Sequence, residues 1–288
     1  MFSAFLITLR EGLEMSLIIG ILLAYLARTG HRREFPAIWA GVAGALGVSV
    51  AAGAIIFVTA GEFSGRGEQL FEAIALLTAV AVLTYMIFWM RRQAVTIRSE
   101  LQARMSEALQ MGSRTALILL TVASVGREGV ETALFLFATA RASSPVAAGT
   151  GAILGLGGAF LLGWLLYRGT YKLDLRAFFN VTSALLLLVG AGLLARGAGE
   201  LVEAGILPAL MEHVWNTDAL VHETSTMGTF LQAMFGYTST PSLLQVMLYA
   251  IYLAAVGWYY FRPAPAPRGG RPSGSVHRSI ETAVPPKP

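Results

Sequence analysis

Two short stretches of this sequence place charged residues inside long apolar surroundings. They read LREGLEMSLIIG, residues 9–20, and GREGVETALFLF, residues 126–137. Both carry an arginine, a glutamate, a glycine and a second glutamate at the same spacing: Arg10, Glu11, Gly12 and Glu14, then Arg127, Glu128, Gly129 and Glu131. A charge held in hydrocarbon costs about 2.5 to 17 kcal/mol, depending on the estimate. These charges must therefore be neutralised by partners within the protein or serve a function.

The four glutamates offer only oxygen atoms, which hard cations prefer as ligands. Residues three apart lie on one face of a helix, so the two glutamates of each motif point the same way. Carboxylate oxygen suits Mg²⁺, Ca²⁺, Mn²⁺ or Fe³⁺, and the small, triply charged ferric ion is the strongest match. The chain has no cysteine, and its four histidines fall outside the apolar runs. The two motifs therefore predict a hard-cation site.

Helix direction predicts how the glutamates meet. If the two helices run in opposite directions, Glu11 should lie level with Glu131, and Glu14 with Glu128, the second pair about 4.5 Å deeper. The alternative is a set of structural ion pairs, because each arginine lies four residues before the second glutamate of its motif. That alternative leaves two glutamates without a counter-charge. Passage of an ion or a proton accounts for the motifs better.

The surrounding composition is that of a membrane protein. Hydrophobic residues make up 55% of the chain and charged residues 13%, and the mean hydropathy is +0.63. These values lie outside the usual range of soluble domains. Runs of about 20 apolar residues, enough to cross a bilayer core, predict seven membrane helices: Ser3–Ala27, Pro36–Ala60, Leu70–Met90, Thr115–Ala138, Val146–Tyr167, Ala177–Ala195 and Leu243–Phe261.

Lysine and arginine are concentrated after the first, third, fifth and seventh runs. The positive-inside rule then predicts an N-terminus outside and a C-terminus in the cytoplasm, within a multi-pass protein of the cytoplasmic (inner) membrane. The first run lacks a preceding basic segment and contains glutamates, so we expect a mature helix and not a cleaved signal. This distribution explains the pI near 9.6, and the lipid bilayer, not nucleic acid, is the expected partner.

The matching motifs predict an internal repeat. Repeat one covers about residues 1–90 and repeat two about 115–196, and since each has three helices, the second must be inverted. The expected fold class is an all-α membrane protein with seven transmembrane helices, comprising two inverted three-helix repeats plus a seventh helix at 243–261. Together they form a permease domain at 1–262. Residues 263–288, rich in proline, glycine and serine, are expected to be a disordered cytoplasmic tail.

Three further acidic residues lie near the predicted helix ends. Glu68 and Glu72 are four apart at the outer start of the third run and could receive the ion there, although acidic residues also favour the dipole at a helix N-terminus. Asp174, at the inner start of the sixth run, could relay the ion or simply cap that helix.

An outer acidic loop is expected at residues 197–242, where the sequence has no lysine or arginine. Within it, Asp218, His222 and Glu223 could capture cations or dock a partner protein. The alternative is an ordinary solvated loop.

The paired R-E-G-x-E motifs, on the first and fourth predicted helices, closely resemble the oxidase-dependent iron transporter family of fungal high-affinity and bacterial Efe-type iron permeases. The resemblance extends to DLRAFFNVTSALLL from Asp174 and GTFLQAMFGYTSTPSLLQVMLYAIYL from Gly228. It covers most of the chain up to about Phe261. It implies an iron permease and not an enzyme, with no cofactor beyond the transported iron ion. The implied iron ligands are the motif glutamates, Glu11, Glu14, Glu128 and Glu131.

The resemblance also implies a partner outside the cytoplasm, either a periplasmic iron-binding or peroxidase-type protein or a multicopper oxidase. We expect Arg10 and Arg127 to hold the glutamates in place, and Gly12 and Gly129 to let a neighbouring helix come close. A relative associated with lead uptake shares the motif, so transport of another divalent cation, such as lead or manganese, stays an alternative. The alternative from another class is an intramembrane metal-dependent enzyme, which the absence of membrane-embedded histidine disfavours.

Overall fold

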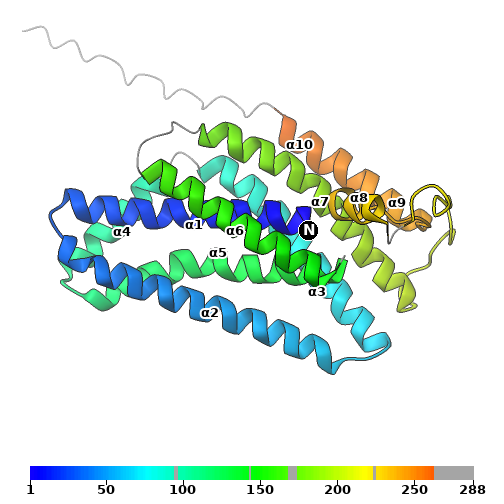
Figure 1. Ribbon diagram of the computed structural model, residues 1–288, viewed down its shortest axis with the longest axis horizontal. Helices are drawn as coiled ribbons and strands as arrows, with labels where there is room; N and C mark the ends of the chain where they lie inside the picture. The colour runs from blue at the N-terminus through cyan, green and yellow to red at the C-terminus, as the bar shows by residue number, and fades with distance from the viewer. Residues whose placement is uncertain (94–96, 143, 168–173, 223–224, 263–288) are drawn as a thin grey trace, which may run out of the picture.

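The computed structural model describes residues 1–93, 97–142, 144–167, 174–222 and 225–262, and the regular secondary structure of these residues is helical (Figure 1). The long helices are α1 (Phe2–Arg28), α2 (Phe35–Glu62), α3 (Arg66–Gln93), α5 (Arg114–Ala142), α6 (Pro145–Tyr167) and α7 (Leu175–Glu203). The short ones are η1 (Arg32–Glu34), α4 (Ile97–Gln110), α8 (Thr226–Phe235) and α9 (Leu243–Tyr252), which continues through a π-helical turn, η2 (Leu253–Gly257), into α10 (Trp258–Phe261). The predicted all-α fold is confirmed.

Five helical segments of the described chain are long and apolar enough to cross a membrane: Arg32–Glu62, Arg66–Met90, Pro145–Leu166, Ala177–Glu203 and Leu243–Phe261. Helices α1 and α5 are of similar length, but each carries one charged motif in its interior. Their membrane crossing, and so the total of seven spans, stays a prediction.

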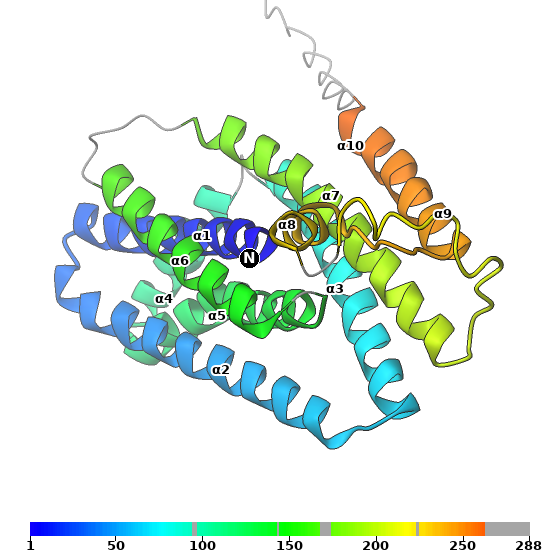
Figure 2. The same ribbon diagram turned by 45° about the vertical axis from the view of Figure 1, so that its right-hand side comes forward.

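The helices pack in three main pairs. Helix α1 lies along α6, α5 lies along α2, and α3 lies along α7 (Figure 2). Small residues bring the first two pairs together, since a Cβ added to Gly12 would lie 2.6 Å from the Cβ of Ala159 on α6. A Cβ added to Gly129 would lie 2.9 Å from the Cβ of Ser49 on α2. The close approach expected at both motif glycines is therefore present.

Two clusters of buried apolar side chains flank the motifs. Along α1, Ile7 belongs to the first cluster and Leu22 to the second, with the motif between them. Along α5 the order is reversed, because Val125 belongs to the second cluster and Phe135 to the first. The two helices therefore run in opposite directions past the same pair of cores, which brings their motifs to one level.

Two helices were not predicted from the sequence, and one predicted boundary was wrong. Helix α4 buries Leu101 and Met105 in the second cluster, against α1 and α5. Helix α7 continues to Glu203, so the segment predicted to be the outer loop begins after Glu203 and not at residue 197. That segment also contains α8. The predicted tail at 263–288 lies outside the described residues.

Candidate cation site

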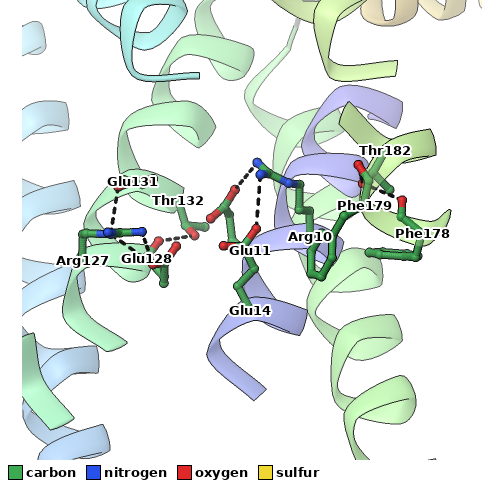
Figure 3. Close-up of polar contacts among 10 residues, drawn as sticks. All are labelled: Arg10, Glu11, Glu14, Arg127, Glu128, Glu131, Thr132, Phe178, Phe179 and Thr182. Atoms are coloured by element: carbon green, nitrogen blue, oxygen red, sulfur yellow. Dashed lines mark hydrogen bonds and ion pairs between the residues drawn. The ribbon is translucent and has the colours of Figure 1, made fainter. Parts of the chain in front are cut away.

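The motifs of α1 and α5 face each other and bring three carboxylates together (Figure 3). One carboxylate oxygen from each of Glu11, Glu128 and Glu131 lies within 4.8 Å of the other two. Glu14 is not part of this group. Glu11 lies near Glu131 as predicted. The two pairs expected at different depths are replaced by one cluster of three carboxylates, because Glu11 also lies near Glu128.

The cluster is buried in the helix bundle except at Glu131. Glu11 is 0% exposed and Glu128 is 2% exposed, whereas the side chain of Glu131 is 18% exposed. Within the interior of a protein, like charges at such separations repel strongly unless protons or cations compensate them. The folded chain therefore concentrates negative charge where water is scarce.

Each arginine bridges the two glutamates of its own motif. Arg10 places Nη1 3.4 Å from a Glu11 oxygen and Nη2 3.3 Å from a Glu14 oxygen. Arg127 places Nη2 2.9 Å from Glu128 Oε1 and Nε 3.4 Å from Glu131 Oε1. The ion pairs considered as the structural alternative are thus present. Two guanidinium charges set against four ionised carboxylates still leave about two negative charges uncompensated.

Part of the hydrogen-bonding capacity of the cluster is unused. One oxygen in each of its three members, Oε2 of Glu11, Glu128 and Glu131, is buried without a hydrogen-bond partner. Buried polar atoms are nearly always satisfied in native proteins, and an unsatisfied one costs about 1–3 kcal/mol. Three such acceptors on one cluster mark a place where a ligand of positive charge fits.

The two arginines differ in their surroundings. Arg10 is 0% exposed, whereas the side chain of Arg127 is 42% exposed. The guanidinium carbon of Arg127 also lies 4.2 Å from the centre of the Trp89 ring on α3. Sequence reasoning missed this contact, since no spacing in the chain signals that α3 reaches the motif of α5.

Glu68 and Glu72 share one cation outside the cluster. Arg141, near the end of α5, lies 3.0 Å from a Glu68 oxygen and also pairs with Glu72. The two glutamates therefore join the start of α3 to the end of α5, and neither belongs to the three-carboxylate group.

The remaining candidates lie apart from the cluster. The backbone N–H of Ala177 donates to Asp174 Oδ1 at 3.1 Å, which makes Asp174 a capping residue at the start of α7. On the segment predicted to be the outer loop, His222 Nε2 lies 3.5 Å from Asp218 Oδ2, and both side chains are solvent-exposed. Glu223 lies outside the described residues.

An all-helical bundle with several apolar helices of membrane length is the architecture of a multi-pass membrane protein. Comparison with known proteins gives the family: the sequence model of the Iron permease FTR1 family matches residues 1–261, and the chain belongs to this family. The resemblance expected from the paired motifs is confirmed.

Individual relatives cover nearly the whole chain. It is 38% identical to the ferrous iron permease EfeU of Yersinia pestis over 265 residues, which is 91% of this chain and 94% of that protein. It is also 38% identical to the ferrous iron permease EfeU of Escherichia coli O6:H1 over 255 residues, 88% of this chain and 92% of that protein. No solved structure matches the chain.

Proposed function

We propose that this protein imports iron across the cytoplasmic membrane and that the ion binds at the carboxylate cluster in transit. The observation that carries the proposal is the set of three buried carboxylate oxygens without partners, on residues whose ligand atoms lie within 4.8 Å. Glu11, Glu128 and Glu131 would provide the first ligands, and Glu14, one turn along α1, would receive or release the ion. Transport requires no bond to be made or broken in the protein.

Charge and family together favour the ferrous ion. About two negative charges remain after the arginines are counted, and a divalent cation would balance them. The relatives described above are named ferrous iron permeases. Manganese and lead, which are also divalent, are the competing substrates to be tested against iron.

We also propose that α1 and α5 cross the membrane, giving seven spans with the N-terminus outside. In that arrangement the first three spans and the next three form inverted repeats. The packing supports this symmetry, because exchanging the repeats converts the α1–α6 pair into the α5–α2 pair. The contact of Gly12 with Ala159 then corresponds to that of Gly129 with Ser49.

An extracytoplasmic iron-binding or oxidase/peroxidase partner would deliver the ion to the outer segment. Asp218 and His222 are exposed there. If they take part in capture or docking, Asp218→Asn combined with His222→Gln should reduce uptake at low iron concentration only. If the double variant takes up iron like the wild type at every concentration, Asp218 and His222 belong to an ordinary solvated loop.

Anaerobic Fe²⁺ uptake into proteoliposomes tests the proposed function. Vesicles containing the purified full chain should accumulate Fe²⁺ above the level of protein-free vesicles, with excess Mn²⁺ or Pb²⁺ reducing uptake only weakly. Accumulation equal to that of protein-free vesicles would refute import by this chain alone. Equal or stronger uptake of Mn²⁺ or Pb²⁺ would reassign the substrate.

A further inference from the structure

The carboxylate cluster is closed on the side of α1 and open on the side of α5. Arg10 and Glu11 are completely buried. On α5, Arg127 and Glu131 retain exposed side-chain surface. The exposed surface next to the cluster therefore lies on the α5 side, at Arg127 and Glu131.

Arg127 lies deep in its helix, 13 residues after the first residue of α5, or about 20 Å along the axis. If α5 crosses the membrane as proposed, an exposed guanidinium at this depth faces water and not hydrocarbon, because hydrocarbon contact is costly. The surface beside Arg127 is then an aqueous opening to the cluster. Trp89 forms one wall of this opening, since its ring lies 4.2 Å from the guanidinium carbon.

A cation in the cluster would bind two of the carboxylates with which Arg127 already pairs, Glu128 and Glu131. Glu128 Oε1 accepts a hydrogen bond from Arg127 Nε at 3.1 Å and lies 2.9 Å from Arg127 Nη2. A metal ion on Glu128 would place a second positive charge next to the guanidinium, and like charges so close disfavour each other. One of the two must move, and Arg127 has exposed surface into which it can move. Arg10 is enclosed on all sides.

We propose that Arg127 is the movable counter-ion of the cluster, and that Trp89 is the positioning residue that retains its guanidinium when the ion binds. This inference rests on the proposed cation site. The face of an indole ring attracts a guanidinium through its quadrupole without offering an anionic oxygen that could bind the metal. Trp89 can therefore stabilise Arg127 away from the carboxylates while leaving the oxygens of Glu128 and Glu131 to the ion.

Anaerobic equilibrium dialysis of Fe²⁺ against the purified full chain in detergent tests this role. Trp89→Leu should weaken Fe²⁺ binding about 3- to 10-fold, as expected for loss of one cation–π contact. Trp89→Tyr and Trp89→Phe should fall between the wild type and Trp89→Leu, in that order. Trp258→Leu is the matched control, because it removes a ring that lies 5.2 Å from the Arg262 guanidinium carbon. It should bind like the wild type.

A double-mutant cycle separates positioning from a general loss of structure. In an Arg127→Gln background, Trp89→Leu should have no further effect on the Fe²⁺ dissociation constant. A wild-type affinity in Trp89→Leu, or an equal loss with and without Arg127, would overturn the inference and leave the proposed function standing. Failure of the wild-type chain to bind Fe²⁺ at all would overturn the proposed function instead.

Discussion

The contact between Gly12 and Ala159 fixes how closely α1 approaches α6, and so where Glu11 lies. A Cβ at position 12 would lie 2.6 Å from the Ala159 Cβ, while carbon atoms in favourable contact are about 3.5–4.0 Å apart. The helices would have to separate by about 1 Å. Ala159 is 1% exposed, and its methyl group cannot rotate away.

We therefore expect Gly12→Ala to destabilise the protein. Overpacking of this kind costs about 1–3 kcal/mol, and the higher helix propensity of alanine returns up to about 1 kcal/mol. The net loss is on the order of 1 kcal/mol. Displacement of α1 should also move Glu11 relative to α5 and reduce iron uptake.

Thermal unfolding in detergent and iron uptake in cells measure the two effects. Gly20→Ala is the matched control on the same helix, because a Cβ there would meet nothing within 4 Å. It should be as stable as the wild type or more so. Adding Ala159→Gly to Gly12→Ala should restore both properties. Equal behaviour of Gly12→Ala and Gly20→Ala, or no rescue by Ala159→Gly, would show that the contact between Gly12 and Ala159 does not set the position of α1.

Three further predictions concern two other contacts and the C-terminal tail. Arg141→Gln removes the cation shared by two α3 carboxylates and should lower the free energy of unfolding by about 1 kcal/mol, whereas Arg104→Gln, which breaks an exposed pair, should leave it unchanged. Tyr252→Phe removes the 2.7 Å hydrogen bond to Thr84 and should lower the free energy of unfolding by about 1 kcal/mol. If Thr84→Val destabilises the Tyr252→Phe variant as much as it destabilises the wild type, the two side chains do not stabilise the protein as a pair. Truncation before Pro263 should leave uptake intact, and a clear loss in correctly inserted protein would show that the tail contributes.

The helical fold and the cluster could be predicted because their signals are local. Apolar runs of membrane length predict the long helices, and the repeated spacing of Arg10 with Glu11 and Arg127 with Glu128 predicts which charged residues lie together. Opposite helix directions then place both motifs at one level.

Other features depend on how helices pack, which the sequence does not state. Helix α4 carries many charged residues, which is typical of a cytoplasmic loop. Its buried residues Leu101, Met105 and Ala108 nevertheless follow one face of the helix. Helix α8 has local signals that were overlooked, since Ser225 caps its start and Gly236 ends it in a left-handed conformation. The meeting of three carboxylates and the stacking of Trp89 depend on helix orientation, which residue spacing does not determine.

Radioactive iron uptake shows whether iron crosses the membrane through the motif carboxylates. It is measured in cells lacking other iron importers and at matched membrane expression of each variant. We expect Glu11→Gln, Glu128→Gln and Glu131→Gln each to abolish most uptake and Glu14→Gln to reduce it. Glu107→Gln, on the exposed face of α4, should transport like the wild type. Full uptake by all four motif variants would mean that the motifs are structural ion pairs and that iron takes another route.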